Sequence, residues 1–114
     1  MAHISTHVLD TAHGRPAAGV RIDFYRHEGG QRDLLRSTVT NADGRTDEPL
    51  LAADEIATGV YEIVFHAGAY FQMSVATPPF LGEVVVRFGV ADARGSYHVP
   101  LLMSPHCYTT YRGS

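Results

Sequence analysis

The sequence contains no lysine, and all nine of its basic residues are arginines. It therefore has no side-chain amine to form a Schiff base or to act as a lysine general base. The arginines are scattered along the chain, and twelve acidic residues give a formal net charge of -3. This balance argues against a nucleic-acid partner.

Cysteine occurs once, at Cys107, so no disulfide can form within the chain. Because Cys107 falls in an apolar segment that reads as the final strand, we interpret it as a small packed residue rather than a reactive thiol.

Long apolar runs are also missing. No segment approaches the roughly 20 residues that span a bilayer, and the first residues lack the basic and apolar blocks of a secretion signal. The last three residues do not form a peroxisomal address. We therefore expect a cytoplasmic protein with no membrane partner. Neither a glycine-rich phosphate loop nor a Gly-x-Ser-x-Gly elbow occurs.

The chain contains enough hydrophobic residues to form a core. It has 114 residues, of which 45% are hydrophobic and 18% charged. These values predict a single globular domain over residues 1–114.

Apolar and polar residues alternate along much of the sequence, which is typical of strands with one face toward a core. Turn residues separate these segments. One short helix is expected over 69–76 and a helical turn at 52–57. The predicted strands are 4–10, 20–25, 34–40, 61–66, 84–90, 97–102 and 106–112.

Short strands with tight turns predict an all-β, antiparallel sandwich. Side chains fill the interior of such a sandwich, so an active site would lie on an exposed sheet face or between subunits. The last strand is a natural sheet edge, and pairing with a second copy would cover it.

Seven histidines are present. In the first strand His3, Ser5 and His7 share a polar face. A metal site on this face is not expected, because four residues of strand span about 13 Å, whereas metal–ligand bonds are about 2 Å long. A solvated sheet face is the simplest interpretation, and a catalytic face is the alternative.

Two further polar residues have ordinary explanations when each is taken alone. His98 alternates with the apolar Tyr97 and Val99, which is compatible with a structural role. Arg45 follows a turn and precedes acidic residues, so it reads as a loop arginine paired with Asp47 or Glu48.

Eight segments carry a more specific signal when they are taken together. They are 5–10 (STHVLD), 14–17 (GRPA), 41–46 (NADGRT), 79–81 (PFL), 86–88 (VRF), 97–102 (YHVPLL), 104–105 (SP) and 111–114 (YRGS). In this order they resemble one family, the 5-hydroxyisourate hydrolases, which are transthyretin-related enzymes of purine catabolism. The resemblance covers nearly the whole chain, and its most specific mark is the C-terminal Tyr-Arg-Gly-Ser.

The resemblance implies a transthyretin-like (prealbumin-like) sandwich of two four-stranded sheets with one short helix. It further implies that edge strands join two subunits, and that two such dimers form a homotetramer with a channel between them. The implied partner is a small molecule, 5-hydroxyisourate, and neither a metal nor an organic cofactor is implied.

The site positions that the resemblance carries over are His7, Arg45, His98, Tyr111 and Ser114. His7 or His98 would activate water, and the residues do not decide which. Arg45 would hold the substrate and stabilise the oxyanion. Tyr111 would contact the substrate, and the Ser114 hydroxyl or terminal carboxylate would orient a histidine or the water.

Three other functions are compatible with such a fold. A non-catalytic carrier of small ligands would use the same channel but line it with apolar residues. A structural or adhesion domain would not gather His7, Arg45 and His98 in space. A metal-dependent hydrolase would lose activity to a chelator.

Overall fold

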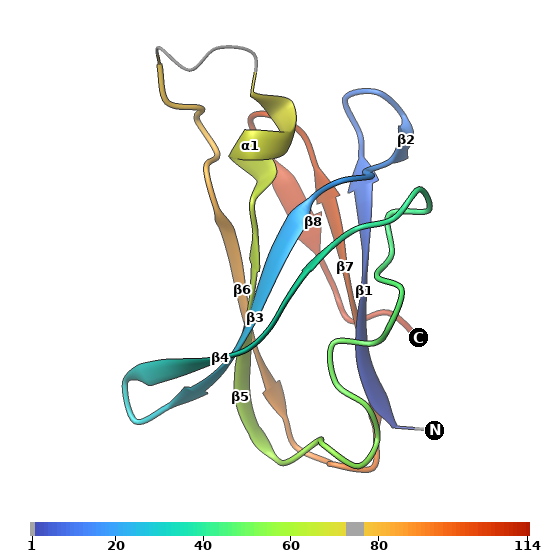
Figure 1. The fold of residues 1–114 in the computed structure, drawn as a ribbon, viewed down its shortest axis with the longest axis vertical. Coiled ribbons are helices and arrows are strands. Elements are labelled where there is room, and N and C mark those ends of the chain that lie inside the picture. Colours follow the sequence, from blue (N-terminus) through green and yellow to red (C-terminus); the bar gives the residue numbers. More distant parts are fainter. Residues whose placement is uncertain (1, 73–76) are drawn as a thin grey trace.

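The computed structural model describes residues 2–72 and 77–114. Its strands form two four-stranded sheets, with the orders β2-β1-β7-β8 and β4-β3-β5-β6, stacked as a sandwich (Figure 1). The elements are β1 (His3–Asp10), β2 (Arg15–Pro16), β3 (Arg21–Glu28), β4 (Gln31–Val39), β5 (Gly59–Phe65), α1 (Ala67–Phe71), β6 (Val84–Val90), β7 (Ser96–Met103) and β8 (Tyr108–Thr110). This confirms the expected fold class of two four-stranded sheets with one short helix.

The alternation in the sequence places side chains as predicted. Along β1, every second residue from Ile4 to Asp10 is buried. The alternate residues, which include His3, Ser5 and His7, are partly exposed. The buried faces of the two sheets meet in one apolar cluster. Its largest fully buried members are Tyr61, Phe24, Phe65, Ile4, Ile22, Leu50, Ile63, Leu101 and Met103.

One strand pair differs from the antiparallel expectation. β1 and β7 run parallel, with Ser5 opposite His98 and His7 opposite Pro100. Alternation identifies the buried face of a strand but carries no information about the direction of its neighbour, so the sequence could not predict this pairing.

Several element bounds also differ from the prediction. β2 forms where only a turn was expected, and α1 begins at Ala67 rather than at residue 69. The predicted helical residues 73–76 lie outside the described residues. At 52–57 the chain makes a turn closed by a 3.0 Å hydrogen bond from the Glu55 N–H to the Ala52 carbonyl.

The final strand, β8, does end its sheet as predicted, but it is shorter than expected. Cys107 precedes it, is exposed, and its Sγ lies 3.3 Å from the Ser104 Oγ. The interpretation of Cys107 as a packed strand residue is therefore wrong. A turn formed after Pro105 occupies the positions that the prediction gave to the strand.

The second edge of β1 carries the loop that follows β4. The Val8 N–H donates to the Gly44 carbonyl at 2.7 Å, and the Leu50 N–H donates to the Ile4 carbonyl at 2.8 Å. Isolated bridges pair His7 with Arg45 and Ile4 with Leu51. β1 is therefore hydrogen-bonded on both sides, and Arg45 is fixed beside His7.

Figure 1 places α1 and β2 at one end of the sandwich, while the C-terminal segment lies toward the other end, beside β1. Among the residues that the structure describes, no helix has the length and apolarity needed to cross a bilayer.

We predict that Gly44→Ala destabilises the fold. Gly44 has a φ of +75°, and a Cβ at this position would collide with the Val8 carbonyl. The strain and the collision together should lower the free energy of unfolding by about 3 kcal/mol. Urea denaturation followed by circular dichroism, at one protein concentration, measures this change.

The matched control is Gly14→Ala, because Gly14 has a similar φ of +66° and a Cβ added there would have nothing within 4 Å. It should cost about 1 kcal/mol. Equal losses in the two variants would contradict the close approach of the Gly44 loop to β1.

Candidate active site

His7 and His98 lie on the outer face of neighbouring strands. Because Ser5 is opposite His98 in the parallel register, His7 is two residues further along β1. Strand spacing and rise place the Cα atoms of His7 and His98 about 8 Å apart. Both histidines are only partly buried, so a small molecule can reach this face.

Each imidazole is held through one ring nitrogen. The His7 Nε2 lies 2.9 Å from the Asp43 carbonyl oxygen, and since a carbonyl only accepts, Nε2 carries the proton. The His98 Nδ1 lies 2.8 Å from the Ser5 Oγ. The two rings thus present different nitrogens, Nδ1 of His7 and Nε2 of His98.

Arg45 projects from the loop beside His7 and is exposed. Within the described part of the chain, no carboxylate lies within ion-pair distance of its guanidinium. Asp47 instead accepts a hydrogen bond from Asn41, and Glu48 accepts one from Arg36. The interpretation of Arg45 as a loop arginine paired with Asp47 or Glu48 is therefore wrong, and its donors face a partly open site.

The C-terminal segment closes the other side of His98. The Gly113 N–H donates to the His98 carbonyl at 2.7 Å, and a Cβ on Gly113 would lie 2.6 Å from Cδ2 of the His98 ring. Glycine therefore lets the backbone pass close to the imidazole. Ser114 follows Gly113 directly in the sequence.

The surroundings of His98 lower its pKa. Burial is the largest cause, followed by the positive charge of Arg45 and by the neighbouring His7 and His3. Each of these disfavours a second positive charge on the ring. His98 is therefore held neutral near pH 7, with a lone pair on one ring nitrogen.

Of the five predicted positions, the structure brings His7, Arg45 and His98 together, and Gly113, the neighbour of Ser114 in the sequence, contacts His98. Tyr111 is different. It is 56% exposed and lines a cavity of about 250 Å³ between β6 and β8, with Phe88 and Tyr97. Neither His7 nor His98 is among the residues that line this cavity.

Sequence reasoning missed the contacts of Ser5 and Gly113 with His98 and the contact of the Asp43 carbonyl with His7. For Ser5 a signal existed, because it shares the polar face with His3 and His7. Its partner His98 could not be predicted, because neither strand's own sequence determines the register between β1 and β7.

Comparison with known proteins identifies the family of this chain. A sequence profile of the HIUase/Transthyretin family matches residues 4–113. The 5-hydroxyisourate hydrolase 2 of Rhizobium meliloti (strain 1021) is 57% identical, over 97% of this chain and 95% of its own length. This chain belongs to the HIUase/Transthyretin family.

Solved structures of the family superpose on the whole chain. The 5-hydroxyisourate hydrolase of Klebsiella pneumoniae is 32% identical with a TM-score of 0.81 and full coverage of both chains. Sea bream transthyretin, solved in complex with thyroxine, is 29% identical with a TM-score of 0.86, over 98% of this chain and 95% of its own.

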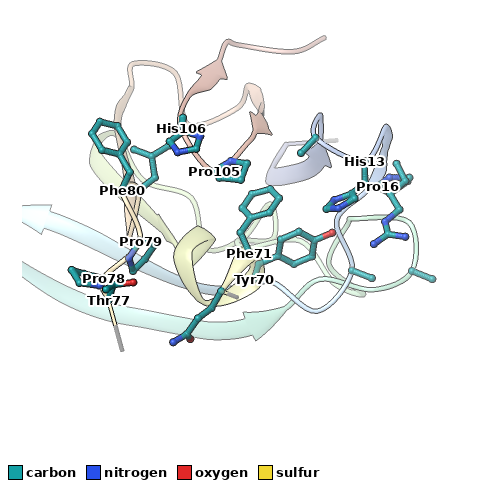
Figure 2. Close-up of a pocket in the computed structure, with 16 residues that line it drawn as sticks. His13, Pro16, Tyr70, Phe71, Thr77, Pro78, Pro79, Phe80, Pro105 and His106 are labelled. Atoms are coloured by element: carbon teal, nitrogen blue, oxygen red, sulfur yellow. The ribbon is translucent and has the colours of Figure 1, made fainter. Parts of the chain in front are cut away.

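A pocket of this HIUase/Transthyretin family member lies at the end of the sandwich that carries α1. It has a volume of about 1030 Å³. Figure 2 shows Tyr70 and Phe71 of α1 between His13 on one side and Phe80 on the other. None of the five predicted site residues lines it.

Three polar groups beside this pocket, those of Asp10, Tyr70 and His13, bind one another. The buried Asp10 carboxylate accepts hydrogen bonds from Tyr70 at 2.8 Å and from the His13 ring at 2.7 Å. Burial alone would raise the pKa of Asp10, but these hydrogen bonds outweigh it and hold the pKa below its ordinary value. The two hydrogen bonds to Asp10 stabilise the turn after β1. We therefore assign this carboxylate no reactive role.

A metal centre has no ligand set in the described ranges. Across residues 2–72 and 77–114, no group of three or more His, Cys, Asp or Glu side chains is arranged to hold an ion.

We predict that Arg45→Gln raises the pKa of His98. Removing one positive charge removes one cause of the lowered pKa, while burial, the larger cause, remains. The pKa should therefore move toward its ordinary value without reaching it. A pH titration of the ring nitrogens by 15N NMR measures the shift.

Arg94→Gln is the control, because Arg94 is exposed and pairs with Asp92 away from this face. It should leave the His98 titration unchanged. If both variants gave the same His98 titration as the unmodified protein, the proximity of Arg45 to the ring would be refuted.

Proposed function

We propose that this protein is a 5-hydroxyisourate hydrolase of purine breakdown, which uses water to open the six-membered ring of its substrate. The observation that carries this proposal is the guanidinium of Arg45 beside two imidazoles on an accessible sheet face, where no carboxylate of the described residues neutralises it. The relatives from Rhizobium meliloti and Klebsiella pneumoniae, which match nearly the whole chain, are each named 5-hydroxyisourate hydrolase.

His98 is the general base in this proposal. Its lowered pKa keeps the ring neutral near pH 7, as a base requires. The Nε2 of the His98 imidazole accepts a proton from water, while the water oxygen bonds to the carbonyl carbon in the six-membered ring of the substrate. The carbon–nitrogen bond then breaks, and His98 returns the proton to the leaving nitrogen. The product is 2-oxo-4-hydroxy-4-carboxy-5-ureidoimidazoline.

Arg45 and His7 stabilise the charge that develops during attack. The guanidinium offers paired donors for a planar oxo-heterocycle and cannot lose its proton. His7 presents Nδ1 to the same space and binds a substrate N–H or, when protonated, an oxyanion. Such groups act most strongly when they are fixed before the substrate arrives, and the Asp43 carbonyl fixes His7.

Tyr111 and Ser114 complete the proposed site in an assembled protein. β6 and β8 end the two sheets, and the cavity between them carries the exposed Tyr111. A second copy that pairs with these edges would close this cavity. We propose a homotetramer built as a dimer of dimers, in which Tyr111 contacts substrate and Ser114 orients His98 or the water.

The alternative is a carrier that binds a small ligand without chemistry, and the sea bream relative was solved with thyroxine. Polarity distinguishes the two functions. A carrier needs apolar walls, whereas the exposed face of β1 carries His3, Ser5 and His7. The clustering of His7 with Arg45 and His98 also contradicts the expectation for a structural domain.

The direct test is the ultraviolet decay of freshly generated 5-hydroxyisourate with and without the protein. The unmodified protein should accelerate the decay, also in the presence of a chelator. His98→Asn should lower kcat by roughly a hundredfold because it removes the proton carrier. An unmodified protein that binds the substrate but leaves its decay unchanged would favour the carrier.

Gly113→Ala tests the approach of the C-terminal segment to His98. The added methyl group would displace either the ring or the segment, and we expect kcat to fall about tenfold because a misplacement of about 1 Å is costly in catalysis. Gly82→Ala is the control, because a methyl group there meets nothing within 4 Å. Full activity of Gly113→Ala would show that this packing does not serve catalysis.

A further inference from the structure

Ser5 contacts the ring that the proposed reaction depends on. It lies directly opposite His98 in the parallel register of β1 and β7. Its Oγ is 2.8 Å from the His98 Nδ1, in a part-buried contact between residues 93 positions apart in the sequence. Ser5 is not among the predicted site residues, and the reaction proposed above assigns it no role.

We propose that Ser5 is a positioning residue that holds the Nδ1 of His98, so that Nε2 faces the substrate and carries the proton in both transfers. The inference rests on the proposed function for its catalytic consequence, but its structural part is independent of it. With Nδ1–H donating to Oγ, the neutral ring has its lone pair on Nε2. The same hydrogen bond persists after Nε2 takes up a proton.

A hydroxyl suits this position better than a carboxylate. A carboxylate beside the ring would favour the charged imidazolium and raise the pKa of His98. Serine fixes the ring without adding charge, which is compatible with a base that stays neutral beside Arg45. It therefore provides orientation while leaving the lowered pKa intact.

Ser5 and Gly113 restrict the ring from two sides. Ser5 holds Nδ1, and Gly113 packs against Cδ2 on the opposite edge of the imidazole. A rotation of the ring would break the first contact and enter the space of the second. His7 is fixed through the other type of nitrogen, by the Asp43 carbonyl, so each of the two rings has its own anchor.

The competing explanation is that the Ser5 hydroxyl only provides a partner for a part-buried ring and contributes to stability alone. The test uses Ser5→Ala, Ser5→Thr and the control Ser37→Ala. Ser37 makes a side-chain hydrogen bond in the other sheet, where its Oγ donates to Asp23 at 2.7 Å. Ser37→Ala therefore reports the effect of losing a serine hydrogen bond away from the site.

We expect Ser5→Ala to lower kcat about tenfold or more with KM changed less than about threefold, because orientation rather than binding is lost. Ser5→Thr, which keeps the hydroxyl, should retain most of the activity. Ser37→Ala should leave kcat unchanged. Equal kcat values in Ser5→Ala and the unmodified protein would overturn the proposal.

A second measurement does not depend on activity. The 15N NMR spectrum of the unmodified protein should show neutral His98 protonated at Nδ1, and Ser5→Ala should shift this tautomer toward Nε2–H. A ring that is already protonated at Nε2 in the unmodified protein would overturn the proposal. If hydrolysis is absent but the tautomer shifts as expected, the proposed function fails while the positioning by Ser5 stands.

Discussion

The two-sided pairing of β1 is the constraint on which the site depends. One edge of β1 binds β7 in parallel, and the other binds the loop after β4. The first pairing puts His98 next to Ser5, and the second puts Arg45 next to His7. The buried residues of β1 anchor the strand in the core, so the polar face is held in one register. A slip by one residue would turn the histidines inward.

Acidic and basic side chains are paired in one sheet, whereas basic groups gather at the site beside β1 and β7. In the other sheet, the buried Glu62 carboxylate forms an ion pair with Arg87 at 2.7 Å. Arg32 and His27 also lie within ion-pair distance of this carboxylate. At the site, Arg45 and two imidazoles gather without such an acid among the described residues. That arrangement disfavours a charged His98, and each unit of pKa shift corresponds to about 1.4 kcal/mol. A substrate that places oxygen atoms between these groups relieves the unfavourable interaction.

The sequence predicted the faces of the strands better than their partners. The alternation in β1 correctly separated the core face from the face of Ser5 and His7, because side chains alternate strictly in a strand. The parallel neighbour β7 was not predictable, since direction and register depend on contacts between distant segments. The same limit hid the contact between Gly113 and His98, although the motif that contains this glycine was recognised.

The position of Tyr111 in a single chain does not account for the role in the site that was expected of it. The resemblance to the family predicted that Tyr111 belongs to the same site as His98. The chain instead turns it toward the cavity between β6 and β8, where Arg112 stacks on Tyr97 with 4.3 Å between the guanidinium carbon and the ring centroid. Tyr111 is exposed there and lies between the edge strands of the two sheets. A second copy that covers these edges would bury Tyr111 and bring the C-terminal segments of two chains close to each other.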